Sequence, residues 1–146
     1  MDKRTEGQAE DSQEEFPGGE GDGQATGKWL DPTRGAGVVS QGPHYHGNAI
    51  DIAAPIGTPL YASDGGTVSH AGWMGSYGNV VFVNHGNGYQ TRYAHMSSID
   101  VSNGQKVSRG QMIGRMGSTG NSTGSHIHFE ILRNGVGTYP GPLIGR

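Results

Sequence analysis

The chain has 146 residues, enough for one domain with a sizeable core, and carries a formal net charge of −3. This charge gives no indication of nucleic acid or of an anionic membrane surface as partner, and the absence of cysteine excludes disulfides and thiolate metal sites. No window approaches the ~18 apolar residues of a membrane span, so we expect no membrane insertion. No signal peptide is recognisable, so a protein working outside a cell would be a mature piece or would leave by another route.

The first 27 residues are polar, acidic and rich in glycine. Phe16 is their only large apolar residue apart from Met1. Such a segment cannot bury enough apolar surface to offset the entropy lost on ordering. We therefore predict a disordered tail or linker over residues 1–27, dispensable for folding and activity, and a folded domain over residues 28–146.

The rest of the chain predicts many short strands. Its glycines, part of a total of 28, separate short apolar runs, and no stretch keeps a 3.6-residue apolar period. We expect an all-β fold with almost no helix, built as an antiparallel sheet, a sandwich or a barrel-like structure. The expected strands cover residues 38–40, 49–53, 58–62, 66–70, 79–84, 89–95, 105–107, 111–116 and 124–132, with a hairpin turn at residues 85–88.

The strand over residues 49–53 carries a carboxylate between apolar neighbours. Ile50 and Ile52 share one face and Asp51 lies on the other. An aspartate in this position is costly to bury unless it is paired or binds a metal. The alternative is that Asp51 caps the turn that follows the strand.

The strand over residues 124–132 carries two histidines on one face. Because residues two apart on a strand point to the same side, His126 and His128 stand next to each other, and Glu130 shares their face. Ile127 and Phe129 point to the core. The pair suits a metal ligand beside an acid–base group, whereas the alternative is two surface histidines on an amphipathic strand.

Three residues on different segments of the sequence form a possible metal-ligand set. His46, Asp51 and His128 give the three nitrogen and oxygen ligands typical of a catalytic zinc site, which leaves a fourth position to water. Alternation over residues 89–95 places His95 on the same face as Tyr93, and we expect His95 and His126 near the metal as proton donors or acceptors.

The two remaining histidines, His70 at a strand end and His85 in a hairpin turn, are expected to be solvated or structural.

From about residue 38 to residue 132 the sequence resembles the lysostaphin-type zinc metallopeptidases, which cleave peptidoglycan cross-links. The matching segments occur in the family's order over roughly two-thirds of the chain. They are residues 48–62 (NAIDIAAPIGTPLYA), 65–68 (GGTV), 77–81 (YGNVV), 93–97 (YAHMS) and 117–130 (GSTGNSTGSHIHFE).

This resemblance implies a lysostaphin-like peptidase domain that holds one Zn²⁺ per chain. Asp51 and His128 match the zinc ligands of the family, and His95 and His126 match its two catalytic histidines. The family usually separates its first histidine from the aspartate by three residues, whereas His46 is separated from Asp51 by four. A bulge could still bring His46 to the metal, and His44 is the alternative third ligand.

The function that the resemblance implies is zinc-dependent endopeptidase activity on bacterial peptidoglycan. A metal-activated water would attack a peptide carbonyl, and the two catalytic histidines would stabilise the oxyanion and transfer the proton. The work would take place outside the cell at the cell wall, or in a phage virion or lysis protein. Two alternatives remain, namely a non-catalytic module on the same fold that binds the cell wall or activates amidases, and a structural β-domain.

Overall fold

The computed structural model describes residues 21–44 and 49–146, with the backbone alone at residues 41–44. Ten strands are present in this part of the chain: β1 (Val38–His44), β2 (Ala49–Ala53), β3 (Pro59–Tyr61), β4 (Gly66–Trp73), β5 (Asn79–Gly86), β6 (Tyr89–Ile99), β7 (Lys106–Val107), β8 (Met112–Met116), β9 (His126–Arg133) and β10 (Val136–Thr138). The only helices within the same residues are two 3-10 turns, η2 (Gly75–Tyr77) and η3 (Gly141–Ile144). The prediction of an all-β fold with almost no helix is confirmed. No helix in the described residues is long and apolar enough to cross a membrane.

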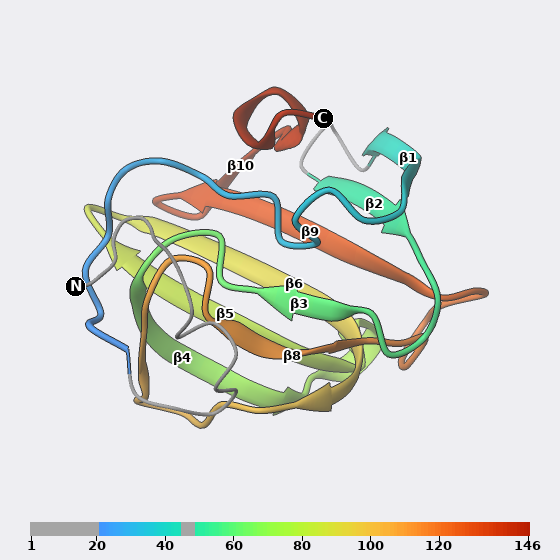
Figure 1. Ribbon diagram of the computed structural model, residues 1–146, viewed down its shortest axis with the longest axis horizontal. Helices are drawn as coiled ribbons and strands as arrows, with labels where there is room; N and C mark the ends of the chain where they lie inside the picture. Colours follow the sequence, from blue (N-terminus) through green and yellow to red (C-terminus); the bar gives the residue numbers. More distant parts are fainter. Residues whose placement is uncertain (1–20, 45–48) are drawn as a thin grey trace.

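The strands form one antiparallel sheet with the order β1-β2-β9-β6-β5-β4-β7. Figure 1 shows β2, β9, β6, β5 and β4 following one another across the sheet. β10 pairs with β9, whereas β8 pairs with both β3 and β6. The sheet thus places β2 and β6 on either side of β9, the strand that carries the two neighbouring histidines.

The hydrophobic core lies on one face of this sheet. Side chains that alternate along β2, β5, β6 and β9 meet there with residues of β3 and β8. Its largest fully buried members are Tyr93, Phe129, Ile50, Ile52, Leu60, Met96, Ile113, Met116, Ile127 and Ile131. On the opposite face, the side chains that the structure describes form only a small buried cluster, made by Val80, Phe82 and Ala94 with Tyr77 packed against it. That face is left open for polar side chains.

The turn between β5 and β6 is shorter than the sequence indicates. Asn87 and Gly88 alone connect the strands, with φ of 53° and 82°. Two consecutive positive φ values are typical of a type I′ hairpin turn, for which Asn-Gly is the favoured pair. His85 therefore lies within β5, where it is buried and binds the carbonyl oxygen of Gly65 and the hydroxyl of Thr91. The expected structural role of this histidine is consistent with these contacts.

Residues 21–27, which the sequence assigns to a tail, are held against the domain. Gly21 and Gly23 donate backbone hydrogen bonds to the β7 region. The carboxylate of Asp64, which is fully buried, accepts from the backbone N–H groups of Thr26 and Gly27 at 2.8–3.0 Å. The difference from expectation has a physical reason: a buried carboxylate needs donors, and this polar segment supplies them. The remainder of the expected tail, residues 1–20, lies outside the described residues.

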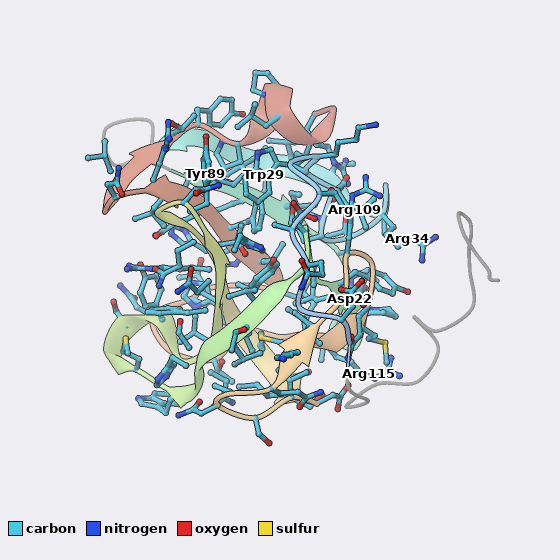
Figure 2. All side chains as sticks on the ribbon, turned by 90° about the vertical axis from the view of Figure 1, so that its left-hand side faces the viewer. Asp22, Trp29, Arg34, Tyr89, Arg109 and Arg115 are labelled. Carbon is cyan, nitrogen blue, oxygen red and sulfur yellow. The ribbon has the colours of Figure 1, made fainter. Side chains whose placement is uncertain are left out.

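The chain then continues from this segment to Trp29, which packs edge-on against His85 and Tyr89 with ring centroids 5.2 and 5.4 Å away. Figure 2 shows Trp29 and Tyr89 next to each other. The aromatic contacts extend the attachment of the N-terminal segment to the β5–β6 hairpin.

Candidate active site

The register between β2 and β9 brings the predicted aspartate and histidine together. Asp51 lies directly opposite His128, while Ile50 and Ile52 are fully buried in the core on the other face. The Oδ1 atom of Asp51 is 3.2 Å from Nδ1 of His128. Strand alternation thus predicted the orientation of Asp51, and the side chain is paired, as a buried carboxylate requires.

His128 is held between two carboxylates. Its Nδ1 faces Asp51, and its Nε2 lies 2.7 Å from Oε2 of Glu130 on the same strand. Burial alone lowers the pKa of His128, but the hydrogen bonds to Asp51 and Glu130 and their charges outweigh it and raise the pKa to about 9. The two carboxylates therefore stabilise a positive charge on the ring at neutral pH.

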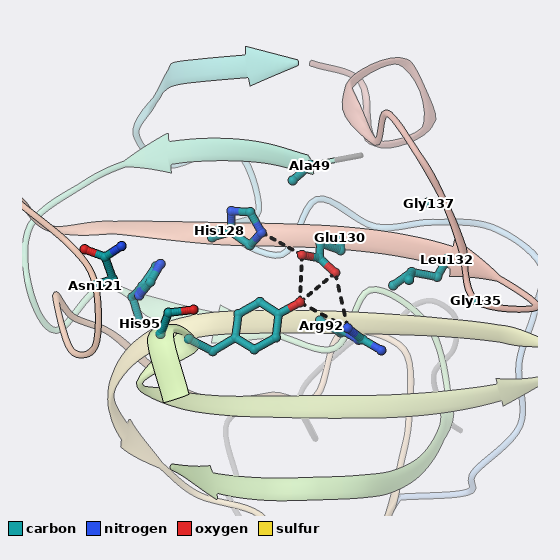
Figure 3. Close-up of a pocket in the computed structure, with 11 residues that line it drawn as sticks. Ala49, Arg92, His95, Asn121, His128, Glu130, Leu132, Gly135 and Gly137 are labelled. Carbon is teal, nitrogen blue, oxygen red and sulfur yellow. Dashed lines mark hydrogen bonds and ion pairs between the residues drawn. The ribbon is translucent and has the colours of Figure 1, made fainter. Parts of the chain in front are cut away.

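Glu130 is in turn fixed by residues of two other elements (Figure 3). The hydroxyl of Tyr77 in η2 lies 2.9 and 3.1 Å from its two oxygens, and the Nη1 atom of Arg92 on β6 is 3.7 Å from Oε1. Burial raises the pKa of Glu130, but the hydrogen bonds to His128 and Tyr77 and the nearby positive charges outweigh it, so that the pKa is lowered. Glu130 is thus an ionised partner that orients the His128 ring.

His95 lies beside His126 and His128 because of an irregularity in β6. The register between β5 and β6 shifts over the segment from Tyr93 to Met96, and His95 has φ of 62°. The prediction that Tyr93 and His95 share a face is wrong. Tyr93 is fully buried in the core, whereas His95 lies beside the other site histidines, because the bulge reverses the alternation.

The orientation of the His95 ring is set by a loop. Its Nδ1–H donates to the carbonyl oxygen of Thr119 at 2.7 Å, since a carbonyl can only accept. The ring centroid lies 4.8 Å from that of His126 and 6.1 Å from that of His128. Burial lowers the pKa of His95, and the neighbouring His126 and His128 lower it further, against the raising effect of Thr119 and Asp51.

His126 lies at the start of β9, where the loop of residues 117–125 meets the sheet. Its Nδ1 is 2.8 Å from the carbonyl oxygen of Gly124 and 3.2 Å from the hydroxyl of Ser122. Its Nε2 is 3.9 Å from Oδ2 of Asp51. His126 and His128 thus lie on the same face, as the sequence predicts, and both face the aspartate.

The side chains that the structure describes include ligand atoms of the types that zinc prefers. Asp51 and His128 supply an adjacent carboxylate oxygen and imidazole nitrogen, and Glu130 on the far nitrogen of His128 is the carboxylate partner that metal-binding histidines typically have. Within the described residues, no three His, Asp or Glu side chains form a complete metal-binding group. The predicted third ligand, His46, lies outside them. So does the side chain of His44, whose backbone pairs with Ala49.

His95, His128 and Glu130 border an open cleft of about 410 Å³. Its walls come from η2, β2, β6, β9, the loop of residues 117–125 and the turn before β10. The residues that line it are Ala49, Ser76, Tyr77, Arg92, His95, Asn121, His128, Glu130, Leu132, Gly135 and Gly137.

Arg92 and Tyr77 are site residues that the sequence interpretation missed. Arg92 lies opposite Glu130 in the register of β6 and β9. Alternation along residues 89–95 places Arg92 on the opposite face from Tyr93, which is the signal that could have found it. No comparable signal exists for Tyr77, because its contact with Glu130 depends on how η2 folds over the sheet.

Comparison with known proteins agrees with this arrangement. The profile of peptidase family M23 matches residues 44–140. The peptidoglycan DD-endopeptidase ShyA of Vibrio cholerae is 48% identical over 107 residues, which cover 73% of this chain and 24% of ShyA. The chain therefore spans about a quarter of the length of this relative.

Two solved structures share the fold. The catalytic domain of the antimicrobial peptidase lysostaphin from Staphylococcus simulans superposes with a TM-score of 0.63 at 32% identity, covering 75% of this chain and 88% of that domain. A zinc-containing peptidase from Vibrio cholerae gives a TM-score of 0.61 at 33% identity, covering 84% of this chain and 38% of that one. On the family match over residues 44–140 and these likenesses, the chain belongs to peptidase family M23.

Proposed function

We propose that the protein is a zinc-dependent endopeptidase that hydrolyses peptide cross-links of bacterial peptidoglycan. The observation that carries the proposal is the close grouping of Asp51, His128, His126 and His95 beside one cleft, in a chain that belongs to a peptidase family. The activity named for the ShyA relative favours a bond between two D-amino acids as the one cleaved. Such a substrate places the work of the protein at the cell wall.

The residues proposed to hold zinc are Asp51, His128 and His46. Zinc bound by them supplies a Lewis acid for the peptide carbonyl and lowers the pKa of a water molecule towards ~7. Support comes from the donor types, from the carboxylate of Glu130 behind His128, and from the zinc-containing structural relative. Because the two carboxylates raise the pKa of His128 to about 9, this histidine would have to lose a proton at neutral pH in order to hold a metal ion.

The two remaining histidines are proposed as proton carriers. Each ring has its Nδ1 beside a backbone carbonyl, that of Thr119 for His95 and that of Gly124 for His126. In the neutral ring the Nδ1–H donates to this carbonyl, which leaves the lone pair on Nε2. That nitrogen can take a proton from the attacking water, and once protonated it can donate to the oxyanion or to the leaving amine.

Digestion of intact peptidoglycan tests this function. The zinc-loaded chain is incubated with purified sacculi, and the released fragments are identified by mass spectrometry. We expect new amino and carboxyl ends at the cross-links, no release in the presence of a chelator, and recovery when zinc is added back. The Asp51→Ala variant is the matched control and should release nothing. A folded, zinc-loaded chain that binds sacculi without releasing fragments would instead support a non-catalytic module.

A further inference from the structure

A second hollow continues the catalytic cleft along β6 and β9, away from His95. It measures about 320 Å³ and is lined by Asn84, Gly88, Tyr89, Gln90, Arg92, Leu132 and Gly135. Arg92, Leu132 and Gly135 line both spaces, so that the two join at Arg92. A peptide lying in the cleft therefore has a continuous path into this hollow.

The guanidinium of Arg92 is fixed at this junction. Its Nε donates to the side-chain oxygen of Gln90 at 2.7 Å, and its Nη1 donates to the hydroxyl of Tyr77 at 3.1 Å. Its Cζ lies 4.3 Å from the centre of the Phe82 ring. These contacts hold the group in place before any ligand arrives, which reduces the entropy lost on binding.

The same contacts leave donors available to a ligand. Within the described residues, the Nη2 atom of Arg92 has no hydrogen-bond partner, and 27% of the side chain is exposed. Gln90 uses its oxygen for Arg92, so its amide nitrogen remains a donor beside the guanidinium.

The charge of the second hollow is set by Arg92 alone. Among the described residues that line it, no other is charged. Glu130, whose Oε1 lies 3.7 Å from Nη1 of Arg92, lines only the first space, where Tyr77 engages both of its oxygens and His128 one of them. A fixed cation beside amide groups, on the wall of a partly enclosed hollow, is the arrangement that recognises a carboxylate.

We propose that Arg92 and Gln90 form a subsite that binds a free carboxylate of the peptide substrate. Arg92 lies opposite Glu130, two residues along β9 from His128, which corresponds to ~7 Å at a strand rise of about 3.3 Å per residue. An extended peptide covers this length with about two residues. The carboxylate therefore belongs to a substrate residue within about two positions of the bond that is cleaved. This inference rests on the proposed function.

A pair of matched substrates tests the subsite. Two synthetic cross-linked peptides, identical except that one has a free carboxylate and the other a carboxamide near the cleaved bond, are compared by kcat/KM. The wild-type chain should prefer the carboxylate about 10- to 100-fold, mainly through KM, as expected for a charge-assisted hydrogen bond. Arg92→Gln should reduce this preference to about twofold or less, because it slows cleavage of the carboxylate substrate more than cleavage of the carboxamide substrate.

Two further variants separate recognition from structure. Arg92→Lys keeps the charge but not the fork of donors and should retain part of the preference. Arg133→Gln is the control for loss of a positive charge, because Arg133 lies over the Tyr89 ring and lines neither space, and it should keep the full preference. Circular dichroism and zinc content confirm that each variant is folded and loaded.

The outcomes that overturn the subsite differ from those that overturn the enzyme. An equal loss of kcat/KM on both substrates in Arg92→Gln would show that Arg92 only positions Glu130 and Tyr77. A wild-type chain that cleaves both substrates equally well would exclude the subsite. If the wild-type chain cleaves neither peptide, calorimetric titration measures how tightly it binds each of them. Tighter binding of the carboxylate peptide, abolished in Arg92→Gln, would support the subsite and reject the endopeptidase activity. Equal binding of both peptides rejects the subsite as well.

Discussion

His95 has a backbone conformation that few residues other than glycine adopt. A φ of 62° in the left-handed region costs free energy and persists only where surrounding contacts enforce it. Here the register shift in β6 imposes this conformation, and the 2.7 Å hydrogen bond from His95 to Thr119 helps to hold it. This backbone conformation turns the ring out of the alternating pattern and places it beside His126, the other proposed proton carrier.

The first prediction separates metal ligands from catalytic histidines. Asp51→Ala and His128→Ala each remove a proposed zinc ligand and should lose zinc and activity together. His126→Ala and His95→Ala remove the proposed proton carriers, so they should keep about one zinc per chain and lose kcat by ~100-fold or more. Metal analysis and kinetics on the same preparations check this. Loss of zinc from His95→Ala would contradict the assignment.

The same measurement decides the third ligand. If His46 binds the metal, His46→Ala loses zinc, while His44→Ala keeps zinc and most of the activity. The reverse result would assign the ligand to His44. Zinc retained in both variants would reject the three-ligand set drawn from the sequence.

The second prediction concerns Glu130, which accepts from the nitrogen of His128 that faces away from Asp51. Glu130→Ala removes this acceptor and frees the ring to rotate, so zinc affinity should fall about 10- to 100-fold. Glu130→Gln keeps an acceptor oxygen and should lose less. Competition with a chromogenic chelator measures the zinc Kd. Asp100→Asn, a carboxylate change outside the cleft, is the control, and a wild-type Kd in Glu130→Ala would contradict the role.

At the scale of elements, the site depends on two loops that touch through their backbones. A Cβ atom added at Gly120 would lie 2.3 Å from the backbone nitrogen of Gly78, and one at Gly78 would lie 2.5 Å from the carbonyl carbon of Thr119. The loop that follows β8 therefore packs against the η2 turn only because glycine occupies both positions. This packing holds the carbonyl that orients His95.

The third prediction follows from this contact. Gly120→Ala should destabilise the protein by about 1–3 kcal/mol and lower kcat, because the loop must move and the Thr119 carbonyl moves with it. Two controls isolate the cause. Gly75→Ala adds strain from a positive φ of 52° without a steric clash, and Gly124→Ala, in the same loop, meets no atom within 4 Å. Urea denaturation and kinetics measure the stability and kcat of the three variants. Equal losses in Gly120→Ala and Gly75→Ala would show that the steric clash with Gly78 is not the cause.

Alternation along strands predicted the parts of the site that depend on one strand at a time. It gave the orientation of Asp51 against Ile50 and Ile52, and the pairing of His126 with His128 on one face. It failed at His95, because a bulge is set by the pairing of β6 with β5 and not by local sequence.

The sequence also could not predict the register between strands that are distant from each other along the chain. Arg92 and Glu130 pair across β6 and β9, and only the assembled sheet shows that a cation stands beside the partner of His128. The proposed carboxylate subsite therefore depends on the structure, although each of its residues can be read in the sequence.

At the scale of the whole molecule, a buried polar network joins the N-terminal segment to the centre of the sheet. The carboxylate of Asp64 accepts from Thr26 and Gly27, and His85 binds Gly65, the next residue along the chain. Composition alone predicted a disordered segment, because it cannot show that a buried carboxylate elsewhere requires these donors. Truncation of the N-terminus is therefore expected to be harmless only if it stops before residue 21.

The last prediction uses the titration of His85 in this network. Burial lowers the pKa of His85 below its ordinary value of 6.5, and the opposing effects of the Gly65 hydrogen bond and the Asp64 charge are smaller. Above about pH 6.5 the ring is neutral in both the folded and the unfolded states. As the pH falls below this value, the unfolded state takes up the proton first, so the free energy of unfolding should decrease until the folded-state pKa is passed.

Urea denaturation of the metal-free chain between pH 7.5 and ~4.5, a range around the ordinary histidine pKa, measures this effect as a difference. Wild type should lose more stability on acidification than His85→Gln, whatever the stability of the variant at neutral pH, because contributions from the active-site histidines are common to both. Nuclear magnetic resonance titration of the His85 ring in the wild-type protein gives an independent value. Parallel stability curves, or a His85 resonance that titrates at or above 6.5, would contradict the prediction and show that water reaches this ring in the folded protein.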